Sequence, residues 1–306
     1  MNAAITARGL TKRYASGGPS LRPGKPIEAL SDLDLDIQAG EIFGFLGPNG
    51  AGKTTLIRLL LGYLHPTSGS ASVLGFDTER DGQAIRARTG YLPGGIALYD
   101  SMSGAELLDY LCRLYRREPS RRAVLTERLE MPATVLRRPV RDYSRGMRQK
   151  IGIIQALQHD PELAILDEPT EGLDPLMQRA FYELLAEIKH DGRTIFFSSH
   201  ILSEVERVCD RVAIIRQGRL VALHEVAALL ARRRRHVEMR LAGAPPALEA
   251  VPGVSTVRFS DGLLTCQLDG DVGPFLRAIN GAAISDLTIE PAHLEEAFLE
   301  YYAEDV

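Results

Sequence analysis

The sequence lacks the features that mark several large classes of protein. No apolar run approaches the roughly 20 residues that a membrane span needs, and the first residues lack the charged-then-apolar order of a secretory signal. The three cysteines stand far apart and form no CxxC pair, which argues against a disulfide framework or a zinc site. The sequence also shows no internal repeats. These absences favour a soluble protein of a reducing cytoplasm.

Charge is distributed unevenly along the 306 residues. Residues 237–306 hold 12 acidic and 3 basic side chains, a net charge of −9. Residues 1–236 hold 28 acidic and 33 basic side chains, a net charge of +5. The simpler interpretation is two separately solvated domains; the alternative is that the acidic segment docks on a basic neighbour in the same chain or in another.

Hydrophobic patterns predict an α/β fold for the larger part. The segments LAILD and TIFFSS are continuous apolar runs of strand length, as expected for strands buried on both faces of a parallel sheet. The segment LSDLDLDI alternates like a half-exposed strand. Residues 79–141 are rich in arginine and helical in pattern, and Ser103 stands three residues before Glu106, which indicates a capping box at a helix start. We therefore expect a sheet and a helical region.

The smaller part follows a basic run, ARRRRH, and we interpret residues 229–236 as a linker. Strands and helices then follow in the order βαββαβ, and a last helix, AHLEEAFLEYY, closes the sequence. That order predicts a small α+β domain with a ferredoxin-like fold at residues 237–306.

The segment GPNGAGKTT fits the pattern GxxxxGK[ST] and lies where a short apolar strand is followed by a helix. Its glycines let the backbone wrap closely around a phosphate, Lys53 adds a positive charge toward the outer phosphates, and the Thr54 hydroxyl can bind Mg²⁺. A glycine turn with a stray lysine is a much weaker interpretation because of the flanking strand and helix. The candidate nucleotide-binding residues are Gly47, Pro48, Asn49, Gly50, Ala51, Gly52, Lys53, Thr54 and Thr55.

Acidic and imidazole side chains follow two of the predicted strands. Asp167 ends LAILD, where its carboxylate would lie beside Mg²⁺, and Glu168 follows it as the candidate general base. His200 follows TIFFSS at the same edge of the inferred sheet, where ligands of open α/β sheets bind. The alternatives are solvent-facing acids, which are improbable in a chain with Lys53, and a structural histidine, which the position of His200 at the same sheet edge as Asp167 makes less favoured.

A second anion site is indicated farther along the chain. In YSRGMRQK, Ser144 and Gly146 lie at the N-terminus of a predicted helix, where unpaired backbone N–H groups bind anions. One chain would then have two phosphate-facing helix starts, which a single nucleotide does not explain.

The motifs occur in a recognisable order: Tyr14, GPNGAGKTT, YSRGM, LAILDEPT, the GLD at residues 172–174, and His200. Over residues 1–228 the chain resembles the ATP-binding subunit of an ABC transporter. The acidic end EEAFLEYY resembles the small C-terminal domain of drug-export-type ABC ATPases. The resemblance implies a P-loop ABC ATPase module with a mixed sheet and a helical subdomain at about residues 79–141.

The same resemblance implies roles for particular residues. Tyr14 would stack on adenine, His200 would contact the γ-phosphate, and Asp174 would lie in the loop that joins the sites of two subunits. Ser144 and Gly146 would face the γ-phosphate of the nucleotide that the partner holds. ATP and Mg²⁺ would then lie between two copies of this chain, or between it and a homologous ATPase subunit, in a head-to-tail dimer.

Two departures from the family pattern concern the nucleotide contacts. The family usually places a glutamine after the strand TGYLP, where this chain has Gly94. The chain also has Arg145 and Met147 where the family more often shows glycine and glutamine.

These motifs predict an ATPase subunit that lies on the cytoplasmic face of the membrane and drives a separate permease. We expect this permease to export drugs or other small molecules. The family docks its permease on the helical region, and no nucleic acid is expected. The alternative is a soluble ABC ATPase that acts on ribosomes or nucleic acid, but such proteins commonly carry two modules or a coiled coil. A P-loop metabolite kinase would leave Ser144, Asp174 and His200 without a shared purpose.

Overall fold

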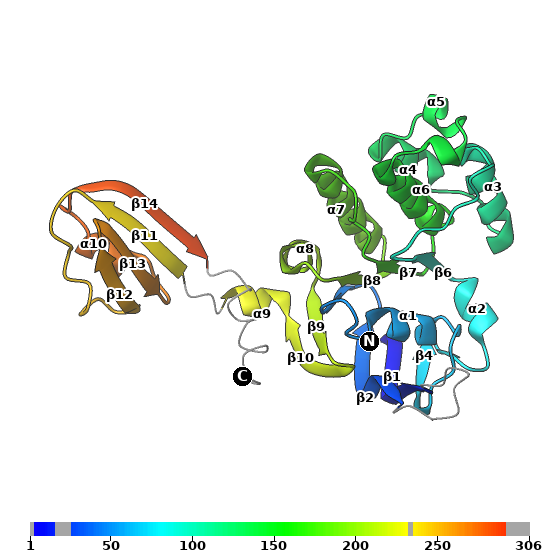
Figure 1. The fold of residues 1–306 in the computed structure, drawn as a ribbon, viewed down its shortest axis with the longest axis horizontal. Coiled ribbons are helices and arrows are strands. Elements are labelled where there is room, and N and C mark those ends of the chain that lie inside the picture. Colours follow the sequence, from blue (N-terminus) through cyan, green and yellow to red (C-terminus); the bar gives the residue numbers. More distant parts are fainter. Residues whose placement is uncertain (1–2, 16–25, 232–234, 292–306) are drawn as a thin grey trace, which may run out of the picture. The chain divides into compact units, whose positions relative to one another are not determined.

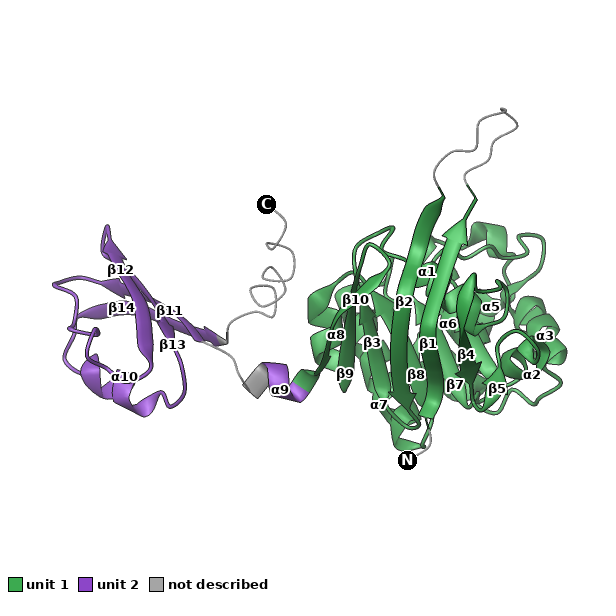
Figure 2. Cartoon of the chain, turned by 90° about the horizontal axis from the view of Figure 1, so that it is seen from below, with its two compact units in different colours: residues 1–226 green, residues 227–306 purple. Residues whose placement is uncertain are grey.

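The computed structural model describes residues 3–15, 26–231 and 235–291, and the chain divides into two compact units, residues 1–226 and 227–306 (Figure 2). The helix α9 (Val226–Ala231) begins at the boundary and overlaps the predicted linker. Within the described residues, no helix is both long enough and apolar enough to span a membrane.

The centre of the first unit is a six-stranded sheet in the order β10-β9-β3-β8-β7-β6. All neighbours pair in parallel except the hairpin of β9 and β10. The strands with continuous apolar runs are fully buried, as their sequences predict, and their carboxyl ends meet at one edge of the sheet. The six strands are β3 (Ile42–Leu46), β6 (Thr89–Leu92), β7 (Leu163–Asp167), β8 (Thr194–Ser199), β9 (Arg211–Arg216) and β10 (Arg219–Glu225).

A second sheet of this unit is antiparallel and has the order β2-β1-β4-β5. Its strand β2 buries Leu33, Leu35 and Ile37 and exposes the polar residues between them, so the alternating pattern of the sequence is confirmed. The strands are β1 (Ala3–Tyr14), β2 (Ile27–Gln38), β4 (Ser68–Val73) and β5 (Phe76–Asp77).

Helices connect and cover these sheets. A group of them, α3 to α6, gathers on the side of the six-stranded sheet away from the antiparallel sheet (Figure 1). The capping box at Ser103 and Glu106 is present at the start of α3. The helices of this unit are α1 (Lys53–Leu60), α2 (Gly82–Arg86), α3 (Gly104–Tyr115), α4 (Arg122–Arg128), α5 (Ala133–Leu136), α6 (Arg145–Leu157), α7 (Pro175–His190) and α8 (Leu202–Val208).

The region predicted as helical, residues 79–141, is not helical throughout. It contains β6, which belongs to the six-stranded sheet, and the last helix of the group, α6, begins beyond it at Arg145. This strand matches the segment TGYLP, which was expected from the sequence to be a strand, and it pairs in parallel with β7.

The second unit contains one four-stranded antiparallel sheet in the order β12-β13-β11-β14. The connection from β13 through α10 to β14 leaves β11 between the two strands, which is the split βαβ arrangement of ferredoxin-like folds. Val237, Met239, Leu264 and Phe275 form part of its core. The elements are β11 (Arg235–Leu241), β12 (Val254–Ser260), β13 (Leu263–Leu268), α10 (Gly273–Ala278) and β14 (Ile284–Pro291).

One expected helix of this unit is absent. Residues 242–253, between β11 and β12, form bends and turns and not a helix. The consecutive prolines Pro245 and Pro246 account for this, because proline supplies no backbone N–H and restricts the residue before it to extended conformations. The last predicted helix, AHLEEAFLEYY, lies outside the described residues.

Candidate active site

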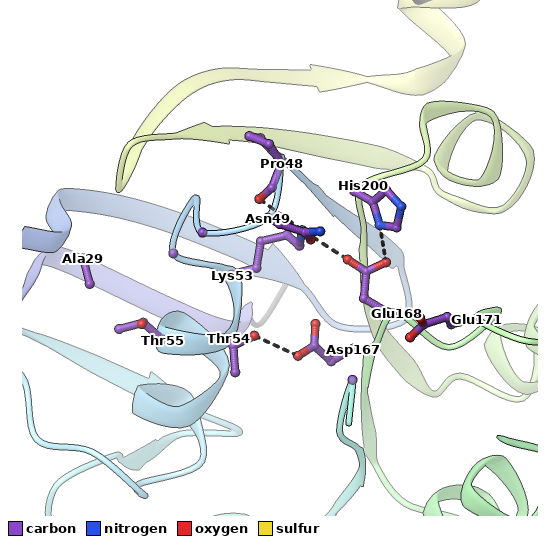
Figure 3. Close-up of a pocket in the computed structure, with 13 residues that line it drawn as sticks. Ala29, Pro48, Asn49, Lys53, Thr54, Thr55, Asp167, Glu168, Glu171 and His200 are labelled. Atoms are coloured by element: carbon purple, nitrogen blue, oxygen red, sulfur yellow. Dashed lines mark hydrogen bonds and ion pairs between the residues drawn. The ribbon is translucent and has the colours of Figure 1, made fainter. Parts of the chain in front are cut away.

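A cavity of about 370 Å³ opens at the carboxyl ends of β3, β7 and β8 (Figure 3). This is the edge of the sheet at which the sequence predicts a ligand. The lining residues come from the phosphate loop, the two strand ends and neighbouring segments: Ala29, Pro48, Asn49, Gly50, Gly52, Lys53, Thr54, Thr55, Gly94, Asp167, Glu168, Glu171 and His200.

The phosphate loop is shaped by glycines that serve different purposes. Gly52 has φ 111°, and a Cβ there would lie 2.5 Å from the carbonyl oxygen of Ala29. A Cβ at Gly47 would lie 2.5 Å from the carbonyl oxygen of Ile215. Gly50 has φ 81° and no atom within 4 Å of an added Cβ, so its need for glycine comes from the backbone conformation. Two of the glycines thus let the loop pack against β2 and β9.

The first residue of α1, Lys53, is buried, and its ammonium group donates a hydrogen bond within the loop. Its Nζ donates to the carbonyl oxygen of Gly47 at 2.6 Å. No side chain caps the start of α1, where Gly52 stands in the left-handed conformation. The backbone N–H groups of this helix start therefore keep their capacity for an anion.

The second residue of α1, Thr54, meets the carboxylate that ends β7. Its hydroxyl donates to Asp167 Oδ2 at 3.1 Å, and Ser198 on the adjacent strand donates to Asp167 Oδ1 at 2.9 Å. Burial raises the pKa of the Asp167 carboxyl, while the two hydroxyl donors oppose that shift. A hydroxyl and one carboxylate fit Mg²⁺, which keeps several waters and takes its remaining ligands from substrate phosphates.

The carboxylate of Glu168 lies between the side chains of Lys53 and His200. Its Oε1 is 3.1 Å from Lys53 Nζ, and its Oε2 is 2.6 Å from His200 Nδ1. Figure 3 shows the Glu168 side chain directed toward both partners, and Asp167 directed toward Thr54. The backbone of Glu168 has φ 51°, a left-handed conformation that costs free energy in any residue with a Cβ.

Gly94 approaches Asp167 so closely that a Cβ would lie 3.3 Å from Asp167 Oδ2. Gly94 itself lines the cavity, so this position supplies no side-chain amide where the family usually places a glutamine. A different amide reaches the same region: Gln149 on α6 donates to the carbonyl oxygens of Pro169 at 2.7 Å and of Glu168 at 3.3 Å. The helical group is thereby joined to the loop that carries Glu168.

Six predicted site residues do not line this cavity, and two of them, Gly47 and Ala51, belong to the phosphate loop itself. Ser144 caps α6 by accepting from Met147 N at 3.2 Å, and Asp174 caps α7 by accepting from Leu176 N and Met177 N. Gly146 packs against the backbone of Gly172, which belongs to the loop that leads to Asp174. The structure thus brings Ser144, Gly146 and Asp174 near one another, and their predicted role at a partner's nucleotide stays a prediction.

The last of these residues, Tyr14, ends β1 opposite Ile27 on β2. Lys12 Nζ lies 5.5 Å from the centre of its ring. Ala29, two residues farther along β2 than Ile27, does line the cavity. Adenine stacking by Tyr14 stays a prediction.

Sequence reasoning missed three residues of the site: Ala29, Glu171 and Ser198. The polar Ser198 near the end of the otherwise apolar TIFFSS was a usable signal, because a hydroxyl in a fully buried strand needs a partner. Ala29 offered no signal, since it reaches the cavity only through the packing of the loop against β2.

Comparisons with known proteins agree with this geometry. The sequence profile of the family described as ABC transporter matches residues 30–171. Among solved structures, the ATP-binding subunit of an ABC transporter superposes with a TM-score of 0.64 and 29% identity, over 74% of this chain and 91% of that one. The fold of the first unit is therefore that of an ABC ATPase cassette.

Two named relatives align over nearly their whole length. The daunorubicin resistance ATP-binding protein DrrA3 of Streptomyces coeruleorubidus is 33% identical over 99% of this chain and 96% of its own. The bacitracin transport ATP-binding protein BcrA of Enterococcus faecalis is 30% identical over 97% of this chain and 96% of its own. An uncharacterised ABC transporter ATP-binding protein of Synechocystis sp. is 42% identical over 67% of this chain, which spans only 58% of that relative.

Proposed function

Because this chain belongs to the family of ABC transporter ATP-binding proteins, we propose that it hydrolyses ATP to drive a separate membrane permease that exports small molecules. The observation that carries the proposal is the position of Glu168. Its carboxylate stands between the buried Lys53 and His200, beside Asp167 and Thr54, at the mouth of the phosphate loop.

This arrangement supports hydrolysis at the γ-phosphate. The open N–H groups of the loop and of α1 hold the phosphates, and Lys53 adds its charge to the outer ones. Glu168 accepts the proton of the attacking water, and His200, in contact with Glu168, orients that carboxylate and reaches the same phosphate. Thr54 and Asp167 would hold Mg²⁺, which neutralises charge on the phosphate oxygens.

A second copy of the chain, or a homologous subunit, completes the site. Ser144 and Gly146 open an anion-binding helix start that lies outside the chain's own cavity. In the head-to-tail dimer, each nucleotide lies between the Lys53 loop of one chain and the Ser144 helix start of the other.

The permease docks at a second cavity, of about 570 Å³, formed by α2, α3 and α6 with the segments beside them. Leu114 and Tyr63 in its lining are 64% and 55% exposed, and none of its described lining residues is acidic. Arg86 stacks on the Tyr63 ring at 5.1 Å, so a cation lies beside the apolar surface. Exposed apolar side chains with basic neighbours fit a partner segment that is apolar with an acidic end.

Helix α6 supplies a rigid connection between docking cavity and nucleotide. Gln155 near its end lines the docking cavity, Gln149 holds the Glu168 loop, and Ser144 caps its start. Thirteen helical residues span about 20 Å, enough to join the two places directly. Movement of the permease segment would thus be transmitted to the nucleotide site through α6 alone.

The direction and cargo of transport are inferred from the named relatives, one linked to daunorubicin resistance and one to bacitracin transport. Both names fit export of drug-like compounds from a subunit bound to the cytoplasmic face of the membrane. The second unit is proposed to be an accessory domain of this subunit.

Co-purification from membranes tests the partner. The tagged chain should retain a polytopic membrane protein, and Leu114→Asp should lose it while keeping its ATPase activity in solution. Val124→Asp is the matched control, because Val124 is a similarly exposed apolar residue (50%) on α4 and does not line the docking cavity. Capture of ribosomes or nucleic acid in place of a membrane protein would favour the soluble alternative.

A further inference from the structure

A buried carboxylate on α8 has no role in the site described so far. Glu204 is 5% exposed, and each of its two carboxylate oxygens accepts a hydrogen bond from a buried hydroxyl. Thr170 donates to Oε1, and Ser199 donates to Oε2 at 2.6 Å. In the part of the chain that the structure describes, no ion pair reaches Glu204. Hydroxyl groups therefore compensate for burying its charge: those of Thr170 and Ser199, and that of Tyr182, which also interacts with the carboxylate.

The hydroxyls of Thr170 and Ser199 belong to the two segments that carry the reacting side chains. Thr170 stands two residues after Glu168, and Ser199 immediately precedes His200. The carbonyl oxygen of Ser199 also accepts from Gly47 N at 3.3 Å, at the first residue of the phosphate loop. Glu204 is thus the common partner of the Glu168 loop and of the His200 segment.

The contact between these segments depends on such a restraint. The 2.6 Å distance between Glu168 Oε2 and His200 Nδ1 spans two separate strand ends. Glu168 also has the costly backbone φ of 51°, which persists only where neighbouring residues hold it. Gln149 holds this loop from the side of α6, and Thr170 with Glu204 holds it from the side of α8.

We propose that Glu204 is a positioning residue for ATP hydrolysis: through Thr170 and Ser199 it fixes the Glu168 loop and the His200 segment at the separation that the reaction needs. This inference rests on the proposed ATPase activity. A purely structural role would lower only the stability of the protein, whereas this proposal predicts that kcat also falls in the molecules that remain folded.

The test separates kcat from KM and from stability. Glu204→Ala should lower kcat roughly 10²-fold, as misplacement of catalytic groups by about 1 Å does, and should leave the KM for ATP nearly unchanged because the Lys53 loop is intact. Glu204→Gln keeps the volume and one acceptor oxygen, and should recover part of the lost kcat.

Single-hydroxyl variants show whether Glu204 acts through its two partners. Thr170→Val and Ser199→Ala each remove one donor and should each lower kcat. In the Glu204→Ala background neither should lower kcat further, because the interaction is already lost. If Glu204→Ala does not fold, these two variants decide: a lowered kcat in either supports the proposal, and wild-type kcat in both overturns it.

Glu41 provides a matched control at the opposite end of the strands. It is 9% exposed, and its Oε1 accepts from Gln38 N at 2.7 Å and from Arg211 at 3.0 Å. Glu41→Ala should lower Tm at least as much as Glu204→Ala, with kcat unchanged. Equal losses of kcat in the two variants, or wild-type kcat in Glu204→Ala, would overturn the role of Glu204. If the wild-type protein itself hydrolyses no ATP, the proposed function fails first.

Discussion

The helix starts of α1 and α6 both offer backbone N–H groups to an anion, yet they differ in what surrounds them. The start of α1 has no side-chain cap, a buried lysine and two strand-end carboxylates within one cavity. The start of α6 is capped by Ser144, is exposed, and lies outside that cavity. One is a site with its chemistry beside it, and the other is, in the dimer proposed above, a half-site whose counterpart comes from another chain.

The largest expected effect falls on the α1 side of this comparison. Glu168→Gln should retain ATP binding and lose roughly 10²–10⁴-fold in hydrolysis, the usual contribution of a positioned base. It should also accumulate an ATP-held dimer, which light scattering would detect. Glu171→Gln is the control, since Glu171 lines the same cavity but pairs with Arg145 and should lose far less. Near-normal turnover of Glu168→Gln would remove Glu168 from the role of base.

A mixing experiment tests whether the two helix starts serve different nucleotides. Lys53→Ala and Ser144→Arg each alone lack a complete site in the dimer. Random pairing in a two-fold dimer makes half of the dimers mixed, each with one intact site, so up to roughly a quarter of sites should recover. ATPase activity must be measured after a tagged pull-down confirms mixed dimers. Confirmed mixed dimers without trapped or hydrolysed ATP would contradict the shared site.

A smaller effect is expected where α6 and the Glu168 loop are joined. Gln149→Leu leaves the carbonyl oxygen of Pro169 without its buried donor, which should lower the free energy of unfolding by about 1–3 kcal/mol and also reduce kcat. Gln155→Leu removes a comparable bond to the carbonyl oxygen of Tyr91, farther along the same helix. Chemical denaturation and steady-state kinetics should show similar stability losses, with kcat reduced only at position 149.

The smallest effect on turnover, none at all, is expected just beyond α6, where His159 affects stability alone. Burial lowers the pKa of His159 to about 4, and its ring stacks on Tyr115 at 3.8 Å. Below pH 6.5 the unfolded chain binds the proton first, so stability falls as pH drops from about 6.5 to about 4, by up to about 3 kcal/mol. His159→Phe keeps the stacked ring and should flatten that part of the stability profile. An unchanged profile would show that other groups cause the acid sensitivity.

The predictability of the two helix starts from sequence also differs. The phosphate loop, Asp167 and Glu168 are set by short local patterns, and the structure brings them together in one cavity. The contacts of Gln149 with Pro169 and of Glu204 with Ser199 and Thr170 depend on how α6 and α8 pack, which no local pattern specifies. In the second unit, the expected order of elements predicted a helix between β11 and β12. The adjacent prolines Pro245 and Pro246 disfavour a helix there, and residues 242–253 form no helix.

The left-handed backbone of Glu168 bears on how this sequence was selected. Glycine or asparagine would occupy φ 51° with less strain, which costs roughly 1–3 kcal/mol in other residues. A library screened only for thermal resistance should therefore enrich glycine at position 168, whereas, under the proposed function, one screened for growth in the presence of a toxic substrate of the permease should restore glutamate. Opposing selections at a single position would then report the proposed function without any assay of hydrolysis.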